Sequence, residues 1–284
     1  NSGDMFPIGT TTVTYMATDP SGNADTATFT VTVNDTEAPV ISNTPAAIIT
    51  ASDAGQCSAV VNWTIPTVND NCSATSTSSH NSGDTFPAGT TTVTYIATDA
   101  SGNTDTTTFT VTVNDTELPV VACPSNTTLV ADSGMCAASA TNLTSATGTD
   151  NCSGVTITSD APSLLPVGTT TVTWTATDGS GNTATCSQQV TVQDMEAPVF
   201  SVCPGNISSC PGTVTFANAE ATDNCSAVTV AQTSGPTTGS TLTAGTYQVT
   251  FTATDSAGNT SSCSFTITVN PNPTVTVSLG NQSV

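Results

Sequence analysis

The stretch from Phe86 to Pro119 occurs four times in the 284 residues, and this repeat constrains the fold more than any other feature. The other copies are Phe6–Pro39, Leu165–Pro198 and the most diverged, Leu242–Asn270. An aspartate before each Ser-Gly-Asn or Ala-Gly-Asn turn marks the period; these are Asp19, Asp99, Asp178 and Asp255, spaced 80, 79 and 77 residues apart. A period near 80 residues is too long for a solenoid repeat and fits one small sandwich domain.

The repeat predicts a tandem array of modules. We expect residues 1–35 to be the back half of module 1, followed by the complete modules 2 (36–115), 3 (116–194) and 4 (195–270) and by the start of a further β domain at 271–284. We interpret the chain as a window from a longer protein, so the lack of a signal peptide or anchor says little.

Each copy has the pattern of two half-buried strands. Val93, Tyr95 and Ala97 alternate with polar residues, as do apolar residues from Phe109 onwards, and Asp99–Asn103 is a turn sequence that makes the pair a hairpin. A further strand is expected at Ala59–Trp63, with Trp63 in the core. With no apolar period of 3.6, the sequence predicts an all-β fold of immunoglobulin-like sandwiches with six or seven strands each.

The charge balance excludes several classes of function. There is no Lys or Arg against 21 acids, giving a net charge of −21. Nucleic acid binding needs cations against phosphate, and so does attraction to an anionic membrane surface. No apolar run is long enough for a membrane helix, so direct membrane insertion of this segment is not expected.

The ten cysteines are expected to pair within modules. Two pairs, Cys123 with Cys186 and Cys203 with Cys263, are absent together from module 2, which has Asn43 or Thr44 and Thr107 there. The remaining cysteines suggest Cys57–Cys72, Cys136–Cys152 and Cys210–Cys225. A zinc site is the alternative, but CxxC pairs and further His ligands are missing. Five disulfides indicate an oxidising, extracellular or cell-surface setting.

Several motifs together resemble the HYR (hyalin repeat) family over residues 1–270. They are Cys-Pro after the linker (Cys123-Pro124, Cys203-Pro204), the Trp63 strand, Thr-Asp-Asn-Cys (Thr149–Cys152, Thr222–Cys225), Phe-Pro-x-Gly-Thr-Thr-x-Val and Ala-Thr-Asp-x-Ser-Gly-Asn. The resemblance implies an immunoglobulin-like extracellular module linked to adhesion. Long acidic arrays of this kind are similar to the stalks of giant bacterial adhesins, including those of gliding Bacteroidota.

The short acidic linkers suggest calcium sites at the joints between modules. In an immunoglobulin-like sandwich the entering chain and the last hairpin turn share one end, so linker acids should approach the Asp and Asn of that turn. Carboxylate and amide oxygens suit Ca²⁺, whereas the same residues also serve turns without any ion, and both interpretations stay open. The candidate sets are Asp35, Glu37, Asp99 and Asn103; Asp115, Glu117, Asp178 and Asn182; Asp194, Glu196, Asp255 and Asn259.

Three further aspartates, Asp70, Asp150 and Asp223, are weaker candidates. They could reach the same end of the module, but a Cys57–Cys72 bond would draw them towards the start of the Trp63 strand. We favour the bond over that placement.

Catalysis is not expected. His80 is the one histidine and lies in a Ser-rich loop, where we interpret it as surface filler, and there is no Lys or Arg to stabilise an oxyanion. The acids recur once per module, which suits structure better than a unique active site.

The leading hypothesis is a non-enzymatic stalk of a cell-surface adhesin or extracellular filament, which spans distance and bears force, with Ca²⁺ and disulfides within modules setting its stiffness. Its expected partners are the neighbouring modules of the same longer chain. The alternatives are a module that binds surface glycans or another protein chain, and an accessory region of a secreted enzyme. A glycan-binding module needs exposed aromatic residues, and the chain has only 13 aromatics in all.

Overall fold

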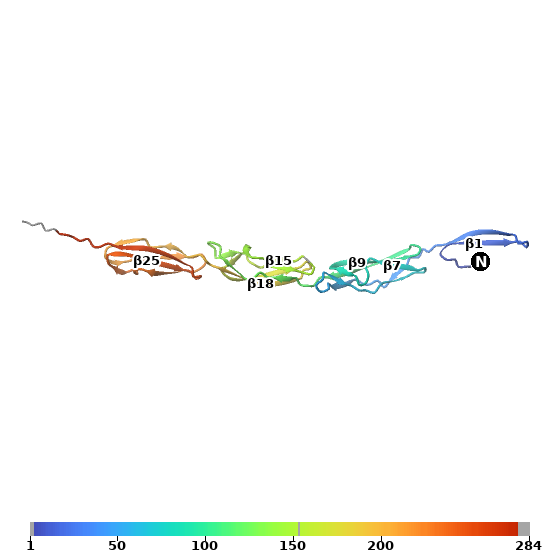
Figure 1. The fold of residues 1–284 in the computed structure, drawn as a ribbon, viewed down its shortest axis with the longest axis horizontal. Coiled ribbons are helices and arrows are strands. Elements are labelled where there is room, and N and C mark those ends of the chain that lie inside the picture. The colour runs from blue at the N-terminus through green and yellow to red at the C-terminus, as the bar shows by residue number, and fades with distance from the viewer. Residues whose placement is uncertain (1–2, 153, 278–284) are drawn as a thin grey trace, which may run out of the picture. The chain divides into compact units, whose positions relative to one another are not determined.

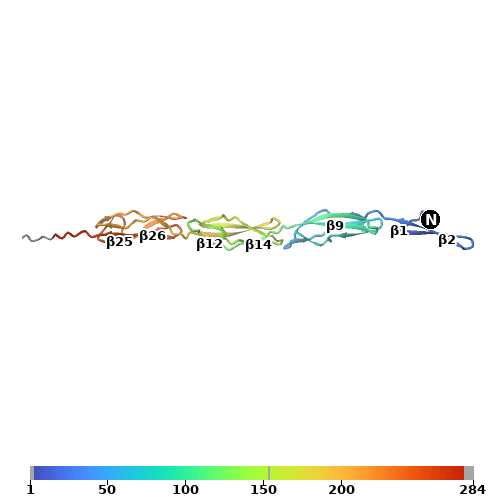
Figure 2. The same cartoon turned by 90° about the horizontal axis from the view of Figure 1, so that it is seen from above.

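The structure, a computed structural model, describes residues 3–152 and 154–277. Within these residues it contains 26 β-strands and a single 3₁₀ turn at Ala140–Asn142 (Figures 1 and 2). The predicted fold class, all-β with tandem sandwich domains, is therefore confirmed. Among the residues described, no helix has the length and apolar character needed to cross a membrane.

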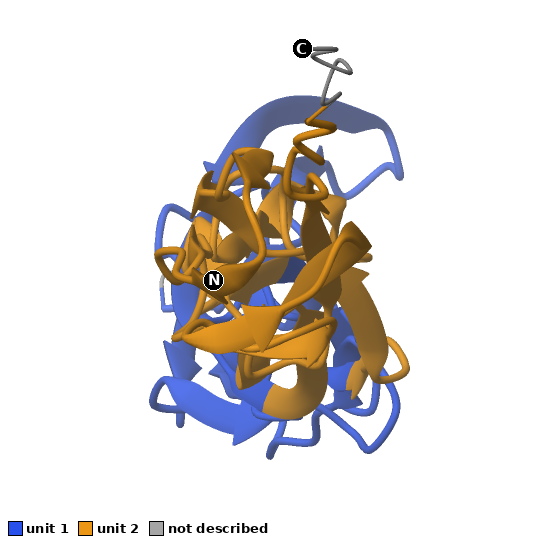
Figure 3. Ribbon diagram, turned by 90° about the vertical axis from the view of Figure 1, so that its left-hand side faces the viewer, with its two compact units in different colours: residues 1–120, 149–156, 177–184 blue, residues 121–148, 157–176, 185–284 orange. Residues whose placement is uncertain are grey.

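Residue contacts divide the chain into two compact units, coloured in Figure 3. The first comprises Asn1–Val120, Thr149–Thr156 and Thr177–Ala184, and the second comprises Val121–Gly148, Ile157–Ala176 and Thr185–Val284. The joints between modules 1 and 2 (joint 1) and between modules 2 and 3 (joint 2) lie in the first unit, and that between modules 3 and 4 (joint 3) lies in the second.

Module 2 is a sandwich of eight strands, against the six or seven expected from the sequence. The main sheet has the order β4-β10-β9-β7, and the pairs β3-β6 and β5-β8 pack against it. The strands are β3 (Val40–Ser42), β4 (Ile48–Ala51), β5 (Ser58–Val60), β6 (Thr67–Asn69), β7 (Ala74–Ser78), β8 (Thr85–Pro87), β9 (Gly89–Asp99) and β10 (Thr104–Asn114).

Modules 3 and 4 repeat this order, with main sheets β12-β18-β17-β15 and β20-β26-β25-β23. The strands of module 3 are β11 (Val120–Ala122), β12 (Thr127–Val130), β13 (Ala137–Ser139), β14 (Thr147–Thr149), β15 (Thr156–Ser159), β16 (Leu164–Pro166), β17 (Gly168–Thr177) and β18 (Thr183–Gln193). Those of module 4 are β19 (Val199–Val202), β20 (Ile207–Ser209), β21 (Gly212–Val214), β22 (Glu220–Thr222), β23 (Thr229–Ser234), β24 (Ser240–Leu242), β25 (Gly245–Thr254) and β26 (Thr260–Val269).

The long hairpin β9–β10 gives module 2 two distinct ends. Thr98 pairs with Thr104 beside the turn, at the end where the chain enters, which we term the incoming pole. Gly89 pairs with Val113 at the opposite end, from which the chain leaves, the outgoing pole. Since β9 has 11 residues at about 3.3 Å each, the poles lie roughly 35 Å apart.

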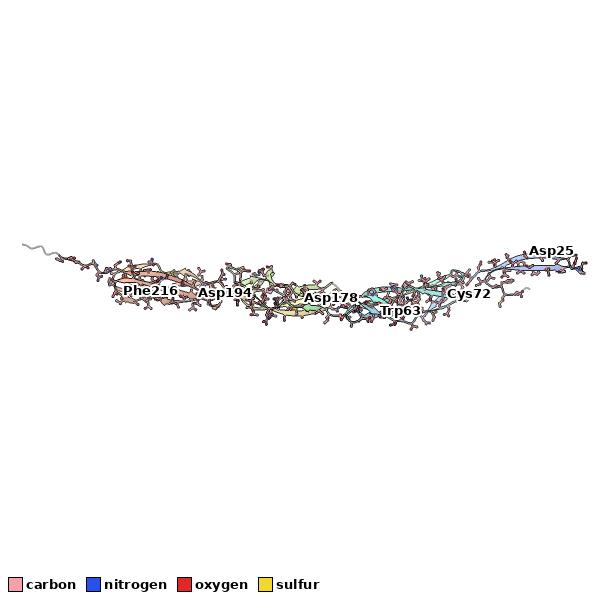
Figure 4. The ribbon with its side chains drawn as sticks, viewed as in Figure 1. Asp25, Trp63, Cys72, Asp178, Asp194 and Phe216 are labelled. Carbon is pink, nitrogen blue, oxygen red and sulfur yellow. A yellow bond between two sulfur atoms is a disulfide. The ribbon has the colours of Figure 1, made fainter. Side chains whose placement is uncertain are left out.

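The alternation predicted for this hairpin is confirmed. Val93, Ala97 and Val111 are fully buried, and Tyr95 is 4% exposed. Trp63, labelled in Figure 4, packs edge-on against Phe109, with ring centroids 5.3 Å apart. It donates its Nε1 hydrogen to Tyr95 Oη at 2.9 Å. The tryptophan thus belongs to the core, as expected.

Module 3 solves the same packing problem with different residues. Trp174 stands at the position of Tyr95 and donates its Nε1 hydrogen to Gln188 Oε1 at 3.2 Å. Gln188 is 1% exposed and its amide donates to the Ser125 carbonyl at 2.8 Å. The buried polar groups are therefore paired, which avoids the cost of an unsatisfied hydrogen bond in the core.

Residues before and after the three modules are described in part. In module 1, β1 (Gly9–Thr18) and β2 (Ala24–Val33) form a hairpin by themselves, and Tyr15 is 62% exposed although its equivalent Tyr95 is buried. Of the further β domain expected at 271–284, residues 271–277 form no strand, and the remainder lies outside the described residues.

One of the predicted differences between modules is visible at atomic level. Cys123 is bonded to Cys186, and Cys203 to Cys263, as the sequence suggested. At this position of module 2, Thr44 Oγ1 donates to Thr107 Oγ1 at 3.1 Å. A hydrogen bond between threonines thus replaces the disulfide.

We predict that the double substitution Thr44→Cys/Thr107→Cys forms a disulfide and stabilises module 2 by about 2–4 kcal/mol, because it constrains the unfolded chain. Denaturant unfolding followed by Trp63 emission, in a Trp174→Phe background, measures the change. The single variant Thr44→Cys serves as control and should give no gain. An oxidised double variant no more stable than this control would contradict the prediction.

Candidate functional site: the joints between modules

Each linker meets the last hairpin turn of the module that follows it. At joint 1 the Asn103 Nδ2 group donates both to the linker carbonyl of Asp35, at 3.3 Å, and to Asp99 Oδ2, at 2.7 Å. The same pair of hydrogen bonds is formed by Asn182 and by Asn259 at joints 2 and 3. The structure therefore brings linker and turn together, and it uses the amide nitrogen of each asparagine to do so.

The turn aspartates are held by their own turns. Asp99 Oδ1 accepts hydrogen bonds from the backbone of Ser101 and Asn103. Burial alone would raise the pKa of Asp99, but the hydrogen bonds from Asn103, Ser101 and Gly102 outweigh it and lower the pKa below 3.8. The pKa values of Asp178 and Asp255 are lowered from the same balance of causes.

The weaker candidates turn out to lie in the joints. Carboxylate oxygens of Asp35, Asp70 and Asp99 lie within 4.8 Å of one another. The equivalent clusters at the other joints are Asp115, Asp150 and Cys152, and Asp194, Asp223 and Cys225. The placement of Asp70, Asp150 and Asp223 away from the linkers was wrong, because it followed from a disulfide that the structure does not form.

Linker and loop aspartates divide their oxygens between two tasks. Asp70 Oδ2 accepts from the Cys72 backbone at 2.8 Å, and Asp35 Oδ1 from the Glu37 backbone at 3.2 Å, so one oxygen of each serves a turn. The other oxygens are buried and have no hydrogen-bond partner among the described residues. They are Asp35 Oδ2, Asp70 Oδ1, Asp150 Oδ1, Asp194 Oδ2 and Asp223 Oδ1.

The linker glutamates have a different task from the aspartates. Glu117 Oε2 accepts the backbone hydrogen of Gly55, in the outgoing loop of module 2, at 2.9 Å. The linker glutamate of joint 3 accepts that of Gly134 at 2.8 Å. The first linker glutamate instead accepts from Asn71 Nδ2 at 3.0 Å. Glu37, Glu117 and Glu196, which the sequence suggested as calcium ligands, thus accept hydrogen bonds from loops.

One disulfide crosses a joint. Cys57 of module 2 is bonded to Cys152 of module 3, with 4.6 Å between their Cα atoms. The expected pairs Cys57–Cys72 and Cys136–Cys152 are therefore wrong. The expected pair Cys210–Cys225 is also absent, since both are free in the structure, as are Cys72 and Cys136.

The expected pairs do not form because their cysteines lie at opposite poles of a module. The Cys57 carbonyl accepts the Ala88 backbone hydrogen at the outgoing pole, whereas Cys72 lies at the incoming pole, where its backbone hydrogen is donated to Asp70 Oδ2. The two ends of β9 are roughly 35 Å apart, but a disulfide needs Cα atoms about 4.4–6.8 Å apart. Cys210 and Cys225 are likewise separated by the length of β26. At one end of this strand the Asn270 backbone donates to the Ser209 carbonyl, next to Cys210, and at the other end Cys225 lies beside Asp194.

His80 has neither an acidic partner nor a cleft among the contacts described for it. Its ring lies 5.1 Å from that of Phe86, and its Nδ1 is 3.1 Å from Ser79 Oγ. It is half-buried against the core rather than surface filler. This environment resembles packing and does not suggest a catalytic base.

Known proteins resemble the whole chain. A family model described as HYR domain matches residues 1–33, 34–113, 114–192 and 193–269. The chain is 38% identical to Hyalin of the sea urchin Strongylocentrotus purpuratus over 99% of its own length and 26% of that protein. It is 36% identical to Hyalin of Lytechinus variegatus over 94% and 54%, so it spans about half or less of these relatives.

More distant similarities cover less of the chain or are weaker. The Serine-rich adhesin for platelets of Staphylococcus aureus is 37% identical over 38% of this chain and 9% of that protein. Among solved structures, protocadherin gammaB7 EC3-6 covers 92% of this chain and 85% of that one at 15% identity, with a TM-score of 0.37, which carries no functional argument. None of these names a gliding bacterium, so that context remains a prediction from the sequence.

We predict that the chain loses stability as the pH falls below about 4. The folded pKa of Asp99 lies below its ordinary value, so the unfolded chain takes up protons first and the stabilisation is lost as the pH drops through the folded value. Urea midpoints at pH 7, 4 and 3, followed by Trp63 emission in a Trp174→Phe background, measure this. Asp99→Asn should flatten the dependence of module 2, whereas Asp25→Asn, at an exposed position, should leave it unchanged; equal slopes in all three proteins would contradict the assignment.

Proposed function

The chain belongs to the HYR domain family, and from this premise we propose that it is a non-enzymatic repeat segment of an extracellular or cell-surface adhesion protein. Its role is to span distance and transmit force between other parts of that protein. The name of one relative, a bacterial adhesin, supports the adhesive setting. Because the chain spans only 26% and 54% of the two hyalins, we assign recognition of partners to the remainder of such a protein.

The recurrence of one set of contacts at successive joints carries this proposal. Each joint has an asparagine that bonds the linker carbonyl, and linker and loop aspartates whose carboxylate oxygens lie within 4.8 Å of one another. At joints 2 and 3 the linker glutamate also bonds the outgoing loop of the preceding module. A unique active site or ligand site would appear once. Contacts repeated at every boundary favour a role in holding consecutive modules together.

The module surfaces fit a spacer better than a glycan-binding domain. All ten aromatic residues of modules 2–4 belong to core clusters or pack against them. The outer face of the long hairpins carries threonine pairs, such as Thr90 with Thr112 at 3.0 Å and Thr169 with Thr191 at 3.2 Å. Glycan sites commonly stack sugars on exposed aromatic rings, and modules 2–4 leave none free for that purpose.

We further propose that the joints bind Ca²⁺. Asp194 is 6% exposed and its Oδ2 atom has no hydrogen-bond partner, and Asp223 Oδ1 beside it has none either. Buried, unpaired carboxylates are costly, and the chain has no Lys or Arg to neutralise them. Oxygen donors of this kind fit a hard divalent cation, with Asp35 and Asp70 as ligands at joint 1, Asp115 and Asp150 at joint 2, and Asp194 and Asp223 at joint 3. The ion would neutralise the paired charges and fix linker to loop.

We predict that millimolar Ca²⁺ raises the thermal midpoint of the full chain relative to EDTA. An ion at 100 times its dissociation constant stabilises the folded state by about 2.7 kcal/mol per site. Calorimetric titration of chelated protein should show saturable binding with one ion per joint.

Variants separate this binding from non-specific attraction to the negative chain. Asp70→Asn and Asp223→Asn should each remove one ion, whereas Asp25→Asn, which makes the same charge change on an exposed hairpin, should remove none. Equal loss in all three variants, or no heat of binding at all, would contradict the calcium sites.

We also predict that the isolated chain binds no glycan or matrix protein with appreciable affinity. An array of surface glycans and matrix proteins, probed with the full chain in Ca²⁺ and again in EDTA, measures this. Saturable binding to one ligand, abolished when that free ligand is added, would support a recognition module in place of a spacer.

A further inference from the structure

The free thiols of joint 3 lie where the bonded cysteines lie in joint 2. In joint 2, Asn151 Nδ2 donates to the Gln56 carbonyl at 2.8 Å, one position before each partner of the Cys57–Cys152 bond. In joint 3, the equivalent Asn224 Nδ2 donates to the Met135 carbonyl at 3.2 Å, one position before Cys225 and Cys136. The two joints therefore dock the same loops in the same register.

The loop that carries the first cysteine is also built alike. The Asp53 backbone carbonyl accepts the backbone hydrogen of Gln56 at 2.9 Å, and the Asp132 backbone carbonyl accepts that of Met135 at 2.9 Å. In each loop a linker glutamate holds the glycine two positions before the cysteine, which is Gly55 or Gly134. The loop turn, the hydrogen bond from glycine to the linker glutamate and the hydrogen bond from asparagine to the loop carbonyl are thus the same in both joints.

The Cys225 thiol of joint 3 contacts the loop that carries Cys136. The Cys225 Sγ atom donates at 3.7 Å to the carbonyl of Met135, the residue directly before Cys136.

We propose that Cys136 and Cys225 form a second disulfide between modules, equivalent to Cys57–Cys152. The reaction is thiol–disulfide exchange with an external disulfide of the low-molecular-weight or oxidoreductase class. One cysteine thiolate attacks that disulfide and releases one external thiol, and the second cysteine then displaces the other. Two protein thiols are oxidised, one S–S bond forms, and the external disulfide is reduced to two thiols.

The two cross-links overlap along the sequence, because Cys136 precedes Cys152. When both are present, the shortest covalent path from Cys57 to Cys225 crosses one bond, follows the 16 residues between Cys152 and Cys136, and crosses the other. With the first bond alone the path from Cys152 to Cys225 would follow 68 residues, because it would pass through the Cys123–Cys186 bond. The cysteines would then form a covalent ladder, that is, a series of disulfides between consecutive modules. Cys72 is equivalent in the repeat to Cys152 and Cys225, and Cys210 is equivalent to Cys57 and Cys136, so both occupy the positions of further cross-links.

Counting free thiols tests the proposal. The full chain is produced in an oxidising compartment, denatured without reductant, alkylated and weighed by mass spectrometry. We expect two labelled cysteines, Cys72 and Cys210. Four labelled cysteines, or none as expected from pairing within each module, would overturn the proposal. Fragments must be made with an Asp- or Glu-directed protease, because trypsin has no site.

Two variants guard against misreading the count. In Cys72→Ser/Cys210→Ser no thiol should be labelled, and two labelled residues there would refute the bond. In Cys225→Ser three should be labelled, with Cys136 newly among them, while the Cys57–Cys152 fragment is unchanged; absence of label on Cys136 would show a different partner.

A mechanical measurement is independent of labelling. When the oxidised chain is stretched from residues before Cys57 and after Cys263, the Cys203–Cys263 bond lies in the load path of both forms. The covalent path from Cys57 to Cys263 should then have a fully extended length of roughly 130 Å over 38 residues with both cross-links, at about 3.4 Å per residue. With the first cross-link alone the path passes through the Cys123–Cys186 bond and should reach roughly 155 Å over 46 residues. The Cys225→Ser variant should show the longer extension. Equal extensions for both proteins would overturn the ladder.

Discussion

The length of the β-hairpin is the constraint on which the remaining structure depends. Eleven residues in β9 separate the two poles of a module, so loops at opposite poles cannot meet within that module. They meet the complementary pole of a neighbour instead. The outgoing loop that carries Cys57 meets the incoming pole of module 3 in this way, whereas the linker aspartates and the loop that carries Asp70 share one incoming pole. Hydrogen bonds, charge clusters and the disulfide at the joints are thus consequences of strand length and turn position.

Charge explains why those joints are distinctive. A chain without Lys or Arg cannot pair its buried carboxylates with side-chain cations, yet Asp115 and Asp194 are each less than a tenth exposed. In each of these carboxylates one oxygen accepts a backbone hydrogen bond. The other oxygen of Asp115 accepts from the Ser180 hydroxyl at 3.4 Å, whereas that of Asp194 has no hydrogen-bond partner among the described residues. The turn and metal interpretations of these acids are therefore compatible, because they use different oxygens of the same carboxylate.

Much of the fold follows from the sequence, because its signals are local. The strand alternation around Tyr95 and the turn at Asp99 depend on residues adjacent in the sequence. The simultaneous replacement of a cysteine pair by Thr44 and Thr107 in module 2 is visible when the repeats are compared. The pairing of Cys57 was missed because each module contributes one cysteine from each pole. Pairing within a module and pairing between modules therefore leave the same count per repeat, and only the distance between poles distinguishes them. Asp70 was misplaced for the same reason, and the hydrogen bond between the two threonines was foreseeable only as the absence of a disulfide.

The glutamate that bonds Gly55 belongs to the linker of the next module, and this has an evolutionary consequence. The boundaries at joints 2 and 3 are both head-to-tail contacts between one type of outgoing pole and one type of incoming pole. Unequal recombination that inserts or removes a whole period rejoins an outgoing pole to an incoming one, so copy number can drift without creating an unmatched boundary. Recombination that shifts the break by part of a period would instead separate a glutamate from its loop, and selection would remove it.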